Sequence, residues 1–341
     1  MYSHKIFRQF FAERYREFCT PDVREKEEKV PNMRKVCILA EDVSAVDTCT
    51  VRLLQKSGFE VSEIPGNRAL PQEDVYDFIK DADAVIAGAE QYSADLLKKL
   101  PKLKVIARRG VGFDNVNLAA AEQCGIRVTR TVGAVEEAVA ELTMAFVLNF
   151  ARLLPQQDAA MKQGKWQRML AMGLSGKTIG LIGFGGIGQE VARRAGAFGM
   201  RVLYYSRRRR MTEEKMLGAE YVELEQLLRE SDFVSLHCPL TEQTFHLIGE
   251  EELEKMKASS VLINTARGPV CDETVLAKAL QQGKIRGAAV DVFPCEPETD
   301  SPLLSCENVM LTPHVATFTR DAFVKMNNMA AQSIIDWLDI E

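Results

Sequence analysis

A glycine-rich turn between two apolar runs is the feature that most constrains how this chain can fold. Residues 178–182 (TIGLI) form an apolar run of strand length, and residues 183–188 (GFGGIG) follow at once. An amphipathic run over residues 187–198 and a second apolar run over residues 202–205 complete a strand, turn, helix and strand. Such a unit predicts a parallel α/β sheet.

The spacing of the glycines in that turn favours a bound dinucleotide. Gly183 permits the tight turn, Gly185 lets the backbone approach a pyrophosphate, and Gly188 allows the helix to pack closely on the strand. The helix that begins there, at Gly186 and Ile187, presents free N-H groups and the positive end of its dipole. The motif alone is a weak signal, but with strand, helix and second strand in order it predicts a Rossmann nucleotide-binding domain.

The end of the second strand bears on which dinucleotide is bound. An NAD site usually carries an acid about 20 residues beyond the glycines, whereas residues 205–210 here are YSRRRR. The uncharged Ser206 would not repel a 2'-phosphate, and Arg207 or Arg208 could bind that phosphate through two hydrogen bonds. We therefore expect NADP(H), with NAD(H) possible because runs of charge are often simply solvated.

Length and composition restrict the class of protein further. A chain of 341 residues can form two domains, and a net charge of -5 argues against nucleic acid or an anionic membrane as a partner. No apolar run approaches the roughly 18 residues of a membrane span. The eight cysteines include no CxxC pair and no metal-ligand spacing, so we expect a reducing, cytoplasmic setting and no metal site.

The remainder of the chain alternates between apolar strands and helices. Residues 1–30 carry an aromatic stripe at helical spacing and are predicted to form a helical extension. A long helix over residues 135–154, ended by Pro155, is expected to connect two domains. The predicted strands are 36–40, 84–87, 105–107, 233–236, 261–263, 288–290 and 309–311, and the other predicted helices are 43–57, 93–100 and 273–282. The alternation predicts doubly wound parallel sheets in both domains.

Three short motifs begin where late strands end and carry one candidate catalytic residue each: Arg267, Glu296 and His314. Strand ends face the crevice of an open α/β sheet, so the three could converge. The set suits hydride transfer to a ketone beside a carboxylate: histidine donates the proton, the carboxylate orients and stabilises the imidazolium, and arginine binds the substrate. Taken singly, each has a structural explanation, as a helix-start ion pair, a turn acid and a loop histidine.

Seven ordered motifs give the chain a resemblance to a known family. They are GVGFDN at 110–115, VAEL at 139–142, GKTIGLIGFGGIG at 176–188, HCPLT at 237–241, NTARGPVCDE at 264–273, AVDVFPCEP at 289–297 and TPH at 312–314. From about residue 36 to the C-terminus, the sequence resembles the D-isomer-specific 2-hydroxyacid dehydrogenases. The resemblance implies a flavodoxin-like substrate domain (31–133 and 315–341) and a Rossmann domain (134–314) with a cleft between them, a C-terminal helix over about 320–338 that returns to the first half, and a homodimer.

The resemblance also implies roles for individual residues. His314 would be the acid or base, with Glu296 as its partner and Arg267 as the third catalytic residue. The backbone of Val111 and Gly112 would hold the substrate carboxylate. The further residues implied at the cofactor site are His237, Pro239, Thr265, Ala266 and Asp291.

Several activities remain open at this point. We favour interconversion of a small 2-keto acid, such as glyoxylate or hydroxypyruvate, and its D-2-hydroxy acid. Phosphoglycerate dehydrogenase is an alternative to which residues 161–168 (MKQGKWQR) are similar, although Glu90 in the loop after the third strand would repel a phosphate. A nucleotide-sensing protein like the C-terminal-binding-protein corepressors is an alternative of another class, because those proteins retain the same three residues.

Overall fold

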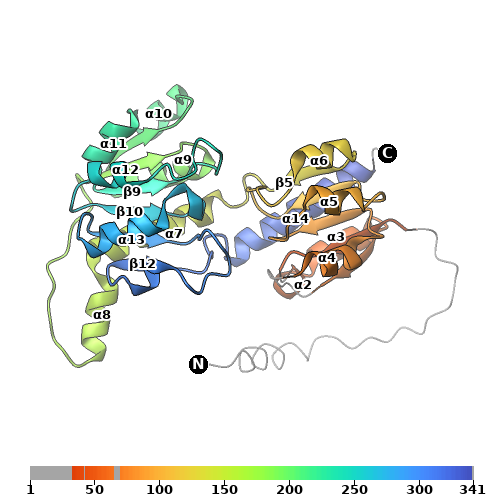
Figure 1. Ribbon diagram of the computed structural model, residues 1–341, viewed down its shortest axis with the longest axis horizontal. Coiled ribbons are helices and arrows are strands. Elements are labelled where there is room, and N and C mark those ends of the chain that lie inside the picture. The colour runs from red at the N-terminus through yellow and green to blue at the C-terminus, as the bar shows by residue number, and fades with distance from the viewer. Residues whose placement is uncertain (1–32, 42, 65–69, 340–341) are drawn as a thin grey trace. The chain divides into compact units, whose positions relative to one another are not determined.

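A computed structural model describes residues 33–41, 43–64 and 70–339. The predicted helical extension, residues 1–30, lies outside these residues. From Arg34 onward the described chain forms two parallel sheets, one of five strands and one of seven (Figure 1). The predicted fold class, two parallel α/β units, is confirmed.

The first sheet has the strand order β2-β1-β3-β4-β5. Its central strands β1, β3 and β4 are almost wholly buried, as their apolar sequences predict. The edge strands β2 (EVSE) and β5 (RVTR) lack an apolar run and were not predicted. The strands are β1 Lys35–Ile38, β2 Glu60–Glu63, β3 Ala84–Ala87, β4 Val105–Arg108 and β5 Arg127–Arg130.

Helices cover both faces of this sheet. One face packs against α4 (Gln72–Ile79), α5 (Ala94–Lys98) and α6 (Leu118–Gln123). The other face packs against α2 (Val43–Val46), α3 (Cys49–Lys56) and the C-terminal helix α14 (Arg320–Leu338). The single helix predicted over 43–57 is wrong, because the Asp47 carboxylate accepts a hydrogen bond from the Cys49 amide (2.9 Å) and turns the chain between α2 and α3.

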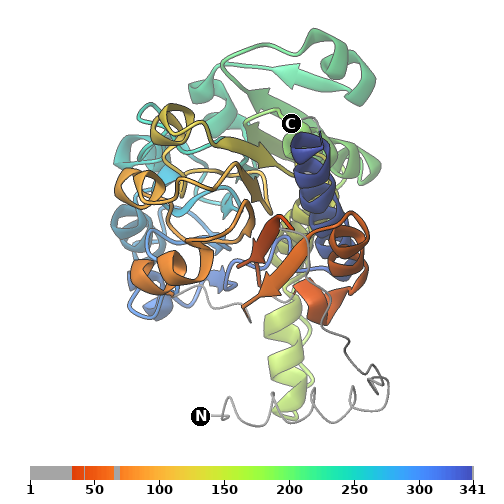
Figure 2. The same cartoon turned by 90° about the vertical axis from the view of Figure 1, so that its right-hand side faces the viewer.

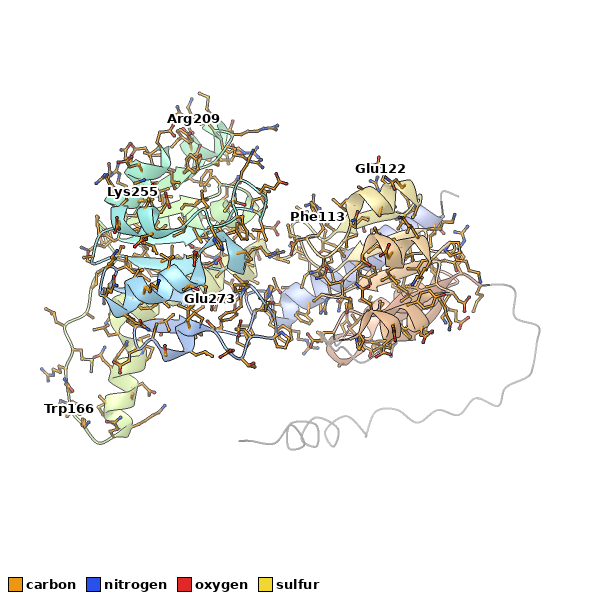
Figure 3. All side chains as sticks on the ribbon, viewed as in Figure 1. Phe113, Glu122, Trp166, Arg209, Lys255 and Glu273 are labelled. Carbon is orange, nitrogen blue, oxygen red and sulfur yellow. The ribbon has the colours of Figure 1, made fainter. Side chains whose placement is uncertain are left out.

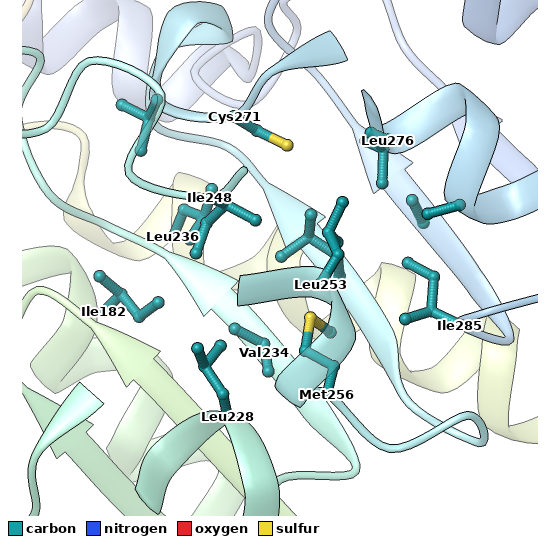
Figure 4. Close-up of a cluster of buried hydrophobic side chains, with 14 of the residues drawn as sticks. Ile182, Leu228, Val234, Leu236, Ile248, Leu253, Met256, Cys271, Leu276 and Ile285 are labelled. Atoms are coloured by element: carbon teal, nitrogen blue, oxygen red, sulfur yellow. The ribbon is translucent and has the colours of Figure 1, made fainter. Parts of the chain in front are cut away.

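The second sheet has the strand order β12-β11-β10-β9-β6-β7-β8 and is also covered on both faces. Its strands are β6 Thr178–Ile182, β7 Arg201–Tyr205, β8 Ala219–Tyr221, β9 Phe233–Leu236, β10 Val261–Asn264, β11 Gly287–Val290 and β12 Val309–Leu311. The helices of one face are α11 Leu224–Glu230, α12 Glu250–Lys255 and α13 Glu273–Gln281, and those of the other are α7 Glu136–Arg152 and α9 Gly186–Ala197. Figure 4 shows side chains of the first of these two layers, including Val234, Leu228 and Leu253, packed together.

The strand order of the second sheet reverses at β6, which pairs with β7 on one side and β9 on the other. Helix α9 begins directly after β6, at the carboxyl end of that strand. Ligands of open α/β sheets bind outside the carboxyl ends of the strands at such a switch point. The fold therefore directs attention to the glycine loop after β6.

Helix α7 does not end in the way that the sequence predicted. It stops at Arg152, Leu153 adopts a left-handed conformation (φ 54°), and α8 (Leu154–Lys162) follows at an angle of 61°. Pro155 thus begins a new helix, where its missing N-H costs no hydrogen bond, rather than terminating the old one. Among the described residues, no single helix is long and apolar enough to cross a membrane, although α7 and α8 together meet that test by length and composition.

The C-terminal helix α14 (Arg320–Leu338) lies against the first sheet although it follows the last strand of the second (Figures 1 and 2). Ala330, Ala331 and Ile334 of α14 pack with residues of β1, β3 and β4. This return agrees with the implied order of segments. The domain boundaries at 133/134 and 314/315 stay a prediction.

Truncating a buried side chain of α14 should destabilise the first lobe. Ile334 is fully buried, so Ile334→Ala should lower the free energy of unfolding by about 2 to 5 kcal/mol. Lys325→Ala, at an exposed position of the same helix, is the matched control. Urea unfolding monitored by circular dichroism measures both variants, and equal midpoints would contradict the packing of α14.

Candidate active site

A cleft of about 550 Å³ is lined by residues from the carboxyl ends of both sheets. The first sheet contributes the loops after β3 and β4, and the second contributes the loops after β6, β9 and β10. Arg267, Glu296 and His314 all line it, as do Val111 and Gly112. The structure therefore brings together the three candidate catalytic side chains and the predicted substrate loop.

His314 and Glu296 are in direct contact. The imidazole Nδ1 lies 2.6 Å from Glu296 Oε2, and the other carboxylate oxygen, Oε1, accepts a hydrogen bond from the Phe293 amide (3.0 Å). Because Nδ1 is engaged, Nε2 is the ring nitrogen left for a ligand. Both side chains are half-buried, at 32% and 26% exposed, and both line the cleft.

The backbone that carries His314 is fixed by Asp291. This fully buried carboxylate accepts hydrogen bonds from the amides of Val315 (2.8 Å) and Ala316 (3.0 Å) and from the Thr312 hydroxyl (2.5 Å). Those bonds hold the chain on both sides of His314, whose φ is +54°. Burial raises the pKa of Asp291, and the three donors act in the opposite direction.

Asp291 is not among the described residues that line the cleft. Its oxygens are used by the loop that it supports, so in this structure it positions the segment that carries His314. Its role at the cofactor site, which the resemblance implies, stays a prediction.

Arg267 reaches from the second sheet to the substrate loop of the first. Its Nε donates to Asp114 Oδ1 (3.1 Å), and its Nη1 donates to the carbonyl of Ala266 (2.8 Å). A Cβ built on Gly112 would lie 1.4 Å from Arg267 Nη2, so only glycine leaves room for the guanidinium. Burial opposes the charge on Asp114, but Arg267 outweighs it and keeps the pKa of this carboxyl below its usual value.

The glycine loop after β6 is closely packed and leads into an uncapped helix. A Cβ on Gly183 (φ +105°) would meet the His237 carbonyl carbon at 2.6 Å, and one on Gly188 would meet the Gly183 oxygen at 2.4 Å, so both glycines are needed for packing. Gly185, Gly186 and Ile187 line the cleft. No side chain caps the start of α9 at Gly185, which leaves its first N-H groups for an anion.

Four more of the predicted cofactor residues, His237, Pro239, Thr265 and Ala266, also line the cleft. Burial lowers the pKa of His237 to about 3, so this imidazole is neutral at physiological pH. Its Nε2 contacts the Ser235 hydroxyl (2.9 Å), while its buried Nδ1 has no partner among the described residues. An unsatisfied buried nitrogen beside the glycine loop is consistent with a site built for a polar ligand.

Comparison with known proteins identifies the family. The profile described as "D-isomer specific 2-hydroxyacid dehydrogenase, NAD binding domain" matches residues 144–316. A glyoxylate reductase of Thermococcus litoralis is 41% identical over 295 residues, which are 84% of this chain and 89% of the relative. The chain belongs to this family. It is an oxidoreductase that uses a nicotinamide dinucleotide.

Further relatives of this 2-hydroxyacid dehydrogenase agree. A glyoxylate reductase of Korarchaeum cryptofilum is 45% identical over 265 residues, covering 75% of this chain and 80% of the relative. The crystal structure of a glyoxylate reductase from Paecilomyes thermophila superposes with a TM-score of 0.79 at 31% identity, covering 89% of this chain and 95% of that one. The prediction of a hydroxyacid reductase is confirmed at this level.

The arginines of residues 207–210 differ in whether an acidic side chain binds them. Arg209 is paired with Glu214 through two hydrogen bonds (2.8 and 2.9 Å), and the Ser206 hydroxyl donates to the Arg208 carbonyl (2.6 Å). Arg207 and Arg208 are exposed, and within the described chain neither guanidinium has an ion-pair partner. Arg207 also acts electrostatically on Cys238, a residue of the cleft, opposing the rise in thiol pKa to about 11 that burial causes.

One residue that matters to this site, Asp114, is not among the residues predicted from the sequence. Asp114 binds Arg267, and the support that Asp291 gives to the segment of His314 was also not predicted. Asp114 lies inside the GVGFDN motif, so its position was known, but its partner is 153 residues away in the sequence. No local pattern identifies such a pair.

Filling the space above Gly112 should damage the active site without unfolding the protein. In Gly112→Ala the new methyl group would displace the Arg267 guanidinium, and a displacement of about 1 Å can lower kcat/KM by about 100-fold. Gly173→Ala is the control, because a Cβ there meets nothing within 4 Å. Steady-state reduction of glyoxylate measures the effect, and unchanged kcat/KM in Gly112→Ala would exclude the crowded geometry.

Proposed function

We propose that this enzyme reduces a small 2-keto acid, of the glyoxylate and hydroxypyruvate type, to the D-2-hydroxy acid. The observation that carries the proposal is the contact of His314 with Glu296 in the cleft that Arg267 also lines. The names of the relatives, glyoxylate reductases at 41% and 45% identity, support the same substrate class. The nicotinamide dinucleotide would supply the hydride.

Each catalytic side chain has a definite task in this proposal. His314 Nε2 donates a proton to the carbonyl oxygen as that oxygen gains charge, and Glu296 at Nδ1 stabilises the imidazolium before the transfer. Arg267 and the amides of Val111 and Gly112 bind the substrate carboxylate and carbonyl. The residues proposed to hold the cofactor's pyrophosphate are the first residues of α9 with Gly185.

Removing the proposed general acid His314 should lower kcat more than it raises KM. His314→Ala should lower kcat by about 100-fold or more, the usual scale for removing a general acid. Glu296→Gln, which keeps a hydrogen-bond acceptor but removes the charge, should lower kcat less. Stopped-flow or steady-state oxidation of reduced cofactor with glyoxylate measures both, and normal turnover in His314→Ala would refute the assignment.

We propose that the preferred cofactor is NADP(H), bound at its 2'-phosphate by Arg207 and Arg208. These two guanidiniums are exposed beside Ser206, while Arg209, labelled in Figure 3, is held by Glu214. The absence of an acid at Ser206 removes the group that would repel the phosphate. NAD(H) remains the alternative cofactor.

Replacing arginines of the run by alanine and measuring kcat/KM with NADPH and NADH tests the cofactor proposal. Wild-type enzyme should favour NADPH over NADH in kcat/KM, and the double variant Arg207→Ala/Arg208→Ala should lose most of that preference because the phosphate loses its partners. Arg209→Ala removes the same kind of charge but should leave the cofactor ratio unchanged. A tenfold preference of the wild type for NADH would contradict the proposal.

We propose that the enzyme is a homodimer joined through the second lobe. The segment 154–173 exposes large apolar side chains, among them Met161, Trp166 and Leu170 at 52%, 78% and 99%. Trp166 is labelled in Figure 3. Apolar groups gathered on one exposed segment are typical of a surface that another subunit covers.

The mass in solution tests the dimer. Light scattering should give twice the 38.1 kDa of one chain, and Leu170→Asp should shift the mass toward the monomer. Met216→Asp, at a position that is 77% exposed on α10 (Met211–Leu217), is the control that should stay dimeric. A monomeric wild type would contradict the proposal.

We also propose a cytoplasmic location. All seven described cysteines are free thiols, and burial raises the pKa values of Cys37 and Cys271, which keeps those thiols unreactive. Such cysteines suit a reducing compartment.

A further inference from the structure

Two oppositely charged residues of the cleft, Glu90 and Arg108, have no role in the proposed hydride and proton transfers. Glu90 follows β3 and Arg108 ends β4, the neighbouring strand, where Ala87 and Arg108 are paired in register. Both residues line the cleft. Glu90 is only 5% exposed, so its position there has a high desolvation cost.

The Asn115 side chain binds the backbone of the Glu90 loop and the guanidinium of Arg108, and the Gly88 amide binds the Glu90 carboxylate. Asn115 Nδ2 donates to the carbonyls of Gly88 (3.3 Å) and Glu90 (2.7 Å), and Asn115 Oδ1 accepts from Arg108 Nε (3.3 Å). The Gly88 amide donates to Glu90 Oε2 (2.8 Å), and Arg108 Nη1 donates to the Arg109 carbonyl. The loops after β3 and β4 are therefore tied together, and the orientation of both charged groups is fixed.

Glu90 and Arg108 influence each other electrostatically but do not form an ion pair within the described chain. Arg108 favours the charged form of Glu90, although burial still raises the pKa of that carboxyl, and burial together with Arg267 lowers the pKa of Arg108. Among the described residues, no ion pair joins Glu90 to Arg108, and Arg108 Nη2 makes no hydrogen bond. The Glu90 carboxylate is bound only by backbone amides, and each of its oxygens can accept more than one hydrogen bond. A fixed acceptor and a fixed donor thus remain for a ligand.

Arg108 lies next to the loop that carries Val111 and Gly112. A Cβ built on Gly110 would lie 3.0 Å from Arg108 Nη1, and Gly112, two residues further on, contacts Arg267. The pair therefore neighbours the loop proposed to hold the substrate carboxylate. A group on the carbon next to the ketone could reach it.

A hydroxyl group is the partner that satisfies both members of the pair. It donates one hydrogen bond, which Glu90 can accept, and accepts another, which Arg108 can donate. A phosphate or second carboxylate would be repelled by Glu90, and a methyl group would exclude water from Glu90 and from Arg108 Nη2 without replacing its hydrogen bonds. Sites built to bind a hydroxyl discriminate strongly against the analogue that lacks it.

We propose that Glu90 and Arg108 form a hydroxyl subsite that selects 2-keto acids with a hydroxyl on C3. This inference rests on the proposed function and refines its substrate. It favours hydroxypyruvate over pyruvate and over the 3-phosphorylated keto acid. The product would then be a D-2,3-dihydroxy acid.

The experiment compares kcat/KM for hydroxypyruvate, pyruvate and glyoxylate in the wild type, Glu90→Leu and Arg108→Met. Wild type should prefer hydroxypyruvate to pyruvate by about 100-fold or more. Each substitution should lower that ratio by at least about 10-fold, since it removes one of the two hydrogen bonds. Glyoxylate has no C3, so it measures general damage to the site. Glu122→Gln, an exposed glutamate on α6, is the matched control.

The possible outcomes are distinct. A hydroxypyruvate to pyruvate ratio near one in the wild type would overturn the subsite, and so would a parallel loss of all three activities with an unchanged ratio, which marks a purely structural pair. Faster reduction of the 3-phosphorylated keto acid than of hydroxypyruvate would overturn it as well. If the wild type reduces none of the keto acids, glyoxylate included, the proposed function itself is wrong and the subsite with it.

Discussion

The buried carboxylate of Asp291 holds the segment on which the active site depends. Three donors from the segment 312–316 meet its two oxygens, and His314 sits between them in a left-handed conformation. Asp291 directly follows β11, and Glu296 lies five residues further along the same loop. The loop after β11 therefore supplies Glu296 and also the carboxylate that holds the segment after β12, on which His314 lies.

A second constraint is the close approach of Arg267 to a glycine. The guanidinium occupies the space that any side chain at position 112 would fill, and Asp114 on the same loop holds it there. The cleft thus has guanidinium groups on both sides, with Arg108 on the first sheet and Arg267 on the second. Guanidinium groups on both sides of one small cavity suit an anionic substrate, while the buried Glu90 limits how much more negative charge that substrate can carry.

Much of this could be predicted from the sequence, for identifiable reasons. Buried parallel strands such as β3 and β10 are continuous apolar runs, which the sequence reveals. The carboxyl ends of parallel strands share one edge of the sheet, so motifs that each follow a strand are expected to converge there. Strands β2, β5 and β8 lack such runs and escaped prediction. The sequence predicts that Pro155 ends a helix, because a proline breaks a helix interior. The sequence alone does not distinguish that position from the first turn of a new helix, where proline is tolerated. The partners of Asp114 and Asp291 depend on folding distant segments together.

In the proposed reaction, hydride passes from the nicotinamide to C2 of a keto acid in this cleft while His314 supplies the proton. The most direct measurement uses reduced cofactor stereospecifically deuterated at C4 of the nicotinamide, with hydroxypyruvate as substrate, and determines the label and chirality of the glycerate by NMR and chiral chromatography. The account predicts D-glycerate carrying one deuterium at C2 from one face of the cofactor and none from the other. Formation of the L-isomer, or of product without deuterium from either labelled face, would contradict it.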